Sequence, residues 1–133
     1  MLYENINKIK HIFKENKVIF SYLFGSQVNG KKGKLSDIDI AVYLDDNLPE
    51  KQRFNKKLSI SAGLSGLLKR EDIDIVVLND AFPLLEHRIL KYGKIIFSID
   101  EKKRIGYEVR ATMRYLDFKP FIDKYTKETI YGR

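Results

Sequence analysis

A run of apolar residues, VIFSYLF, extends from Val18 to Phe24. β-branched and aromatic residues dominate this run, and such a composition without alternation is typical of a strand that is buried on both faces. Gly25 and Ser26 end the run, and the glycine- and lysine-rich segment after them predicts a loop. We therefore expect this strand to lie inside a sheet that helices cover.

A second strand is predicted over residues 37–44, where apolar positions alternate with Asp37 and Asp39 at the start. Two carboxylates spaced by two on a strand point to the same face, so their oxygens can share one divalent cation. An isolated D-x-D pair is more often a turn residue and a surface acid. Gly25 and Ser26, ten residues upstream, favour a site, because glycine lets backbone N–H groups approach a phosphate and serine supplies a hydroxyl donor.

A third strand, predicted over residues 73–78, places Asp72 and Asp74 on one face. If it neighbours the second strand at roughly 5 Å, three carboxylates converge within reach of one metal. Their repulsion costs about 3 kcal/mol per pair at an effective dielectric near 20, and a bound cation would remove that cost. Magnesium fits best, since it prefers carboxylates together with water and substrate phosphates. Two magnesium ions could activate an attacking oxygen and neutralise a leaving pyrophosphate.

The remaining elements are predicted from apolar residues at helical spacing and from short apolar runs. Helices are expected at residues 2–15, 54–68, 83–90 and 105–116, the last ending near Pro120, and a fourth strand at 94–97. The order α-β-β-α-β-α-β-α predicts an α/β protein of the α+β type, with a mixed sheet of about four strands backed by helices. We expect one domain over residues 1–133, with residues 119–133 as a C-terminal tail that is either loosely ordered or a docking segment.

Composition narrows the chemistry further. The absence of cysteine excludes disulfides and thiolate metal sites, and His11 and His87, which we expect to be structural or surface residues, argue against zinc. The net charge of +7 is as consistent with a polyanionic or acidic partner as with a solvated lysine-rich surface. The N-terminal segment lacks a signal peptide and no run reaches membrane-spanning length, so we expect a cytoplasmic protein.

Two segments carry a resemblance to a known family. FGSQVNGKKGKLSDIDIAVYL resembles the glycine-serine, ten residues, D-x-D signature of the DNA polymerase β-like nucleotidyltransferases, specifically their minimal nucleotidyltransferase (MNT) branch. IDIVVLNDAFPLLEHRILKYGKIIF is similar to the third-strand segment of that branch. The resemblance implies that fold, with Gly25 and Ser26 holding the nucleotide phosphates. It also implies that Asp37, Asp39 and Asp74 are catalytic and bind the metal, with Asp72 as the fallback for Asp74.

Stand-alone MNT proteins are often encoded beside a HEPN-domain ribonuclease toxin. The resemblance therefore implies a magnesium-dependent antitoxin that transfers AMP from ATP to a tyrosine of a HEPN partner, with which it forms a hetero-oligomer. We expect no added acceptor-holding domain of the kind that larger superfamily members carry. Two alternatives stay open: an antitoxin that acts by binding alone, and nucleotidyl transfer to a small molecule or an RNA end. Direct binding of nucleic acid is not favoured.

Overall fold

The computed structural model of the chain describes residues 2–25 and 37–130. Its elements in chain order are η1 (Tyr3–Asn5), α1 (Ile6–Glu15), β1 (Val18–Phe24), β2 (Ile38–Leu44), α2 (Glu50–Leu68), β3 (Ile73–Val77), η3 (Leu78–Asp80), α3 (Pro83–Tyr92), β4 (Lys94–Ser98) and α4 (Glu101–Ile130). Apart from the two short 3₁₀ turns, this is the predicted order of helices and strands, which is confirmed. The strand β1 has the predicted bounds, whereas α2 and α4 begin before the predicted residues.

The four strands form one mixed sheet in the order β3-β2-β1-β4. β1 pairs antiparallel with β2 on one side and with β4 on the other, while β2 and β3 run parallel. The predicted fold class, a mixed sheet of about four strands backed by helices, is therefore confirmed. The neighbouring positions of β2 and β3, on which the metal-site hypothesis depended, are confirmed as well.

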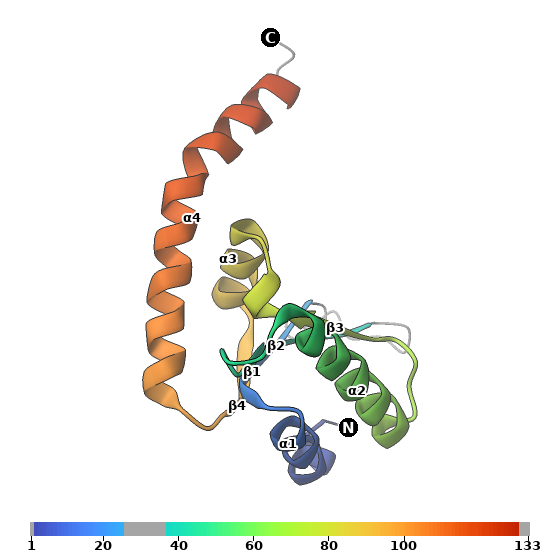
Figure 1. Cartoon of the computed structure of the whole chain (residues 1–133). Helices are drawn as coiled ribbons and strands as arrows, with labels where there is room; N and C mark the ends of the chain where they lie inside the picture. Colours follow the sequence, from blue (N-terminus) through green and yellow to red (C-terminus); the bar gives the residue numbers. More distant parts are fainter. Residues whose placement is uncertain (1, 26–36, 131–133) are drawn as a thin grey trace.

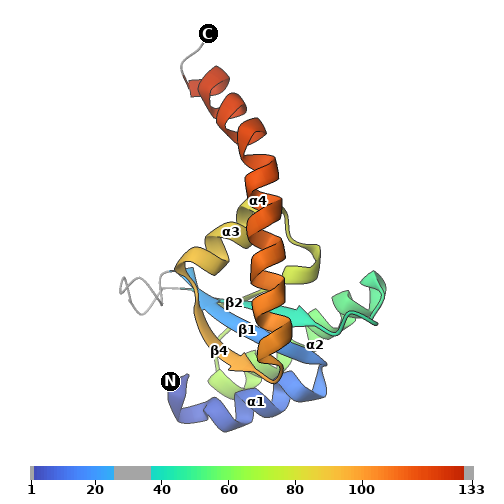
Figure 2. The same ribbon diagram turned by 90° about the vertical axis from the view of Figure 1, so that its left-hand side faces the viewer.

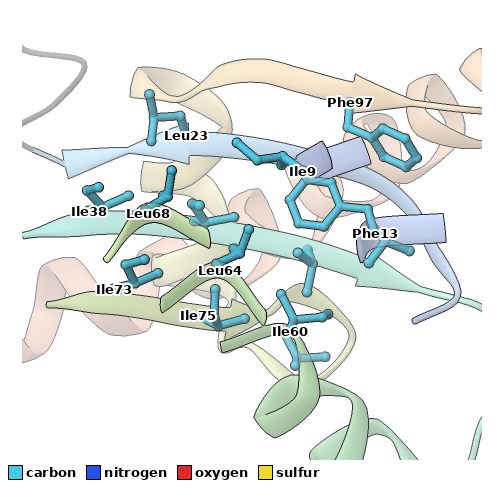
Figure 3. Close-up of a cluster of buried hydrophobic side chains, with 14 of the residues drawn as sticks. Ile9, Phe13, Leu23, Ile38, Ile60, Leu64, Leu68, Ile73, Ile75 and Phe97 are labelled. Atoms are coloured by element: carbon cyan, nitrogen blue, oxygen red, sulfur yellow. The ribbon is translucent and has the colours of Figure 1, made fainter. Parts of the chain in front are cut away.

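Helices cover both faces of the sheet (Figures 1 and 2). On one face, α1 and α2 place side chains such as Ile9, Phe13 and Leu64 against the apolar residues of the strands (Figure 3). On the other face, α3 and α4 contribute Ile89 and Tyr107, which pack in a second cluster of buried residues. The central strand β1 supplies residues to both clusters, as its continuous apolar sequence predicts.

The predicted end of the last helix near Pro120 is wrong, because α4 continues through this residue to Ile130. Proline lacks the N–H that an inner helical turn uses, and it costs about 3 kcal/mol in a helix interior. A helix can accommodate this residue by bending, and α4 bends in its C-terminal part, where it extends away from the sheet (Figure 1). Residues 131–133 of the predicted tail lie outside the described residues, and the single-domain organisation stays a prediction.

None of the helices in the described ranges combines the length and the apolar composition needed to cross a membrane.

Candidate functional site

Two aspartates face each other across the parallel pair of strands. Asp39 of β2 is directly opposite Asp74 of β3 in the register. Opposed residues of neighbouring strands point to the same face of a sheet. The pKa of Asp39 is raised, first by burial and then by the negative charges of Asp74 and Asp37. The charges of two further aspartates therefore act on the half-buried carboxylate of Asp39.

This group of acids is an open site rather than a closed metal cage. Within the described ranges, no three carboxylate or imidazole side chains are arranged closely enough to hold a metal ion by themselves. Magnesium does not require such a cage, since it is usually bound by one or two carboxylates together with water and substrate phosphates. No positive side chain of the described part offsets the raised pKa of Asp39. A carboxylate whose charged neighbours in the described part are all negative fits a divalent cation.

Gly25, which directly follows β1, places its backbone beside the carboxylate of Asp39. Its φ of +84° lies in the left-handed region, which favours glycine. A methyl group at this position would lie 2.2 Å from Oδ2 of Asp39, which is closer than any side chain can approach. With any other residue here, the carboxylate of Asp39 would have to move away from the backbone. Ser26, the second predicted phosphate ligand, lies outside the described residues.

Asp72, the fallback for the third acid, is engaged elsewhere. Nε of Arg70 donates a hydrogen bond of 2.7 Å to Oδ1 of Asp72, and Nη2 of Arg70 pairs with Oδ2. The arginine lowers the pKa of Asp72. Asp74 instead lies opposite Asp39, and no ion pair joins it to another described residue. The geometry thus favours Asp74, and the roles of all these residues stay predictions.

A groove that sequence reasoning missed runs beside Asp74. It has a volume of about 480 Å³ and follows the outer edge of β3, between the first half of α2 and the start of α3. Its lining includes Asp74, Phe54, Phe82 and Leu85. Phe54 is the first residue of the helix predicted over residues 54–68, and 56 % of it is exposed. Phe82, at 81 % exposure, gave no signal other than its place directly before the helix-starting Pro83.

A second cavity, of about 460 Å³, lies on the face that α3 and α4 cover. Its lining includes Glu86, which is only 2 % exposed. The carboxylate of Glu86 accepts a 2.6 Å hydrogen bond from the hydroxyl of Tyr107 and bonds of 3.0 and 2.8 Å from Arg114. His87, expected to be structural or on the surface, stacks on Tyr115 with ring centroids 3.6 Å apart. These contacts join α3 to α4.

Comparison with known proteins gives this geometry a context. The family model described as polymerase beta, nucleotidyltransferase, matches residues 7–102. This segment includes Gly25, Asp39 and Asp74. A curated relative, the protein adenylyltransferase MntA of Shewanella oneidensis, is 31 % identical over 113 residues, which are 84 % of this chain and 77 % of the relative.

Solved structures agree in fold over almost the whole chain. A chain in a crystal structure of a toxin–antitoxin with AMP-PNP has a TM-score of 0.70 and 28 % identity, covering 91 % of this chain and 98 % of that chain. A chain in the structure of a tri-AMPylated Shewanella oneidensis HEPN toxin in complex with MNT antitoxin has a TM-score of 0.66 and 27 % identity, with coverages of 94 % and 98 %.

Proposed function

Since this chain belongs to the polymerase β nucleotidyltransferase family, we propose that it is a magnesium-dependent protein adenylyltransferase. It transfers AMP from ATP to a tyrosine of a HEPN-domain toxin and thereby inactivates the toxin. The observation that carries this proposal is the in-register pair of Asp39 and Asp74, with the backbone of Gly25 directly against Asp39. The named relatives support the choice of acceptor, because they are a protein adenylyltransferase and an AMPylated HEPN toxin with its MNT antitoxin.

The strand order places the expected phosphate contacts on one side of Asp39 and the expected general base on the other. β2 lies between β1 and β3, so Asp39 lies between Gly25 on one side and Asp74 on the other. The backbone at Gly25, together with Ser26, would bind the triphosphate through N–H and hydroxyl donors. Asp37 and Asp39 would hold magnesium, and Asp74 would face the acceptor. When bound, two magnesium ions would neutralise the phosphates and the pyrophosphate that leaves.

The transfer itself requires a nucleophile, a base and a leaving group. The phenolic oxygen of the acceptor tyrosine attacks the α-phosphorus of ATP and forms a new oxygen–phosphorus bond. The bond from the α-phosphorus to the bridging oxygen of the β-phosphate breaks, and pyrophosphate leaves with the electron pair. The phenolic proton passes to the carboxylate of Asp74, which acts as the general base. Asp74 is exposed, so the hydroxyl of another protein can reach it.

Transfer of AMP can be distinguished from transfer of phosphate by the position of the label. The chain is incubated with magnesium, its HEPN partner and ATP labelled on either the α- or the γ-phosphate. We expect the α-label on the partner and the γ-label in pyrophosphate, with no transfer by Asp39→Asn. Transfer of the γ-label, or equal α-labelling by the variant, would contradict the proposal.

The same variants test neutralisation by binding alone. The proposal expects that a chain carrying both Asp37→Asn and Asp39→Asn still binds the toxin but no longer protects cells from it. Full protection by this double variant would favour the binding alternative. We also infer a cytoplasmic location, where ATP and the RNA substrates of a ribonuclease are present.

A further inference from the structure

We propose that the groove along the outer edge of β3 binds an extended segment of the acceptor protein and presents its tyrosine to Asp74. This inference rests on the proposed adenylyl transfer and adds where the acceptor binds. Asp74 is itself part of the lining of the groove, so the groove opens directly onto the candidate site. Phe54 and Phe82 flank it from α2 and from the residue that precedes α3.

The position of the groove agrees with the direction from which an acceptor must approach. Gly25, the expected phosphate contact, lies on the β1 side of Asp39, and Asp74 lies on the β3 side. A nucleophile attacks the α-phosphorus from the side opposite to the leaving pyrophosphate. The acceptor should therefore arrive from the β3 side, and the groove lies along that edge of the sheet.

The outer edge of β3 favours an extended peptide. β3 is the last strand of the sheet, and among the described residues its only partner strand is β2. A strand with one unpaired edge offers backbone N–H and C=O groups to an added strand, and side-chain pockets then provide specificity. The groove lies beside this edge, so a peptide paired with β3 would place side chains in it.

The lining favours an apolar protein segment over an RNA end. Phe54, Phe82 and Leu85 are exposed apolar residues that border the same groove, and such patches mark interaction sites. The acidic residues of the lining are Glu50, Asp74 and Asp80, the last paired with Arg53 outside the lining, against the single lysine Lys57. Carboxylates repel the phosphates of a nucleic acid, whereas the ring of a tyrosine can pack on the two phenylalanines.

Kinetics with the HEPN partner as the acceptor test the groove. Phe82→Ala and the double variant Phe54→Ala with Phe82→Ala should raise KM for the acceptor by roughly tenfold or more, with KM for ATP unchanged. Tyr92→Ala is the matched control, because Tyr92 is an aromatic residue of α3 with 55 % exposure that does not line the groove. It should change neither constant. Normal acceptor KM in the groove variants would overturn the inference while leaving the proposed transfer intact.

A cross-link locates the acceptor independently of rate. The chain has no cysteine, so Phe82→Cys introduces a single thiol, to which a benzophenone maleimide is attached. Mass spectrometry should find the cross-link from position 82 in the peptide that carries the acceptor tyrosine. The same probe on Tyr92→Cys should not cross-link to that peptide. A cross-link from position 82 confined to a distant peptide would overturn the inference. If the wild-type chain modifies no tyrosine, the proposed transfer itself fails, and the groove inference fails with it.

Discussion

The backbone of Gly25 lies directly against the carboxylate of Asp39, where an added methyl group would lie 2.2 Å from Oδ2. This contact joins the two halves of the sequence motif, the turn after β1 and the acidic start of β2. The antiparallel pairing of the two strands produces it, because Phe24 is opposite Asp39 in the register. The pairing thus places the expected phosphate contact and the expected metal ligand next to each other.

Replacing Gly25 with alanine should damage both folding and activity. The positive φ strains any other residue, by about 1 to 3 kcal/mol, and the new methyl group must displace Asp39. We expect a lower free energy of unfolding and at least a tenfold loss of AMP transfer. Gly66→Ala in α2 is the control, because a methyl group added at this position meets nothing within 4 Å. It should be neutral or stabilise by up to about 1 kcal/mol. Equal behaviour of the two variants would contradict the account.

The stability of Asp39→Asn should depend on pH. The folded-state pKa of Asp39 is raised by burial and by Asp74 and Asp37. The contribution of Asp39 to the free energy of unfolding is therefore most favourable below the usual aspartate pKa. It is lost as pH rises through the folded-state pKa. In urea unfolding, the variant should be more stable than wild type at pH 7, and this advantage should disappear at acidic pH.

Asp72→Asn is the matched control for that pH series. Arg70 lowers the pKa of Asp72. The contribution of Asp72 to the free energy of unfolding is therefore present above the usual aspartate pKa and is lost as pH falls through the folded-state pKa. This variant should be less stable than wild type at pH 7, and the difference should shrink in acid. The same sign of effect for both variants would show that the charges around Asp39 do not act as described.

Asp74 and Asp72 should differ in their effect on catalysis. Removal of a general base typically costs a factor of about 10² to 10⁴ in rate. Asp74→Asn should therefore lower kcat for AMP transfer by that amount. Asp72→Asn should stay within a few-fold of wild type, because Asp72 is paired with Arg70. Steady-state rates of both variants provide the test, and the reverse ranking would assign the role to Asp72.

Glu86 should matter for stability. Glu86→Ala leaves the buried hydroxyl of Tyr107 and the guanidinium of Arg114 without their acceptor, and an unsatisfied buried group costs about 1 to 3 kcal/mol. Glu101→Ala, which removes an exposed carboxylate and leaves Arg104 its second partner, Glu108, is the control and should change the unfolding curve much less. Equal losses in the two variants would show that the buried link between α3 and α4 stabilises the fold no more than the pair of Glu101 with Arg104 does.

The pairing of Asp39 with Asp74 follows from the sequence to an unusual degree. Alternation with a period of two puts each aspartate on one face, and a parallel register then brings them together. The sequence did not predict the order of the strands, their parallel direction or this register. Pro120 shows the opposite case: a local rule that usually ends a helix fails where the helix bends instead.

Phe54 and Phe82 mark the limit of sequence reasoning. An apolar residue at helical spacing indicates a packed face, but spacing does not distinguish packing within the chain from packing against another molecule. The exposure of both rings and the groove between them become visible only when α2, β3 and the start of α3 are placed in space.

The intact mass of the HEPN partner after incubation with ATP and magnesium tests the central claim most directly. With the wild-type chain, we predict that the partner gains the mass of one or more AMP groups on tyrosine. With Asp39→Asn, we predict an unchanged mass, although the two proteins still form a complex. An unchanged partner with the wild-type chain, or the same AMP increments with Asp39→Asn, would contradict the account.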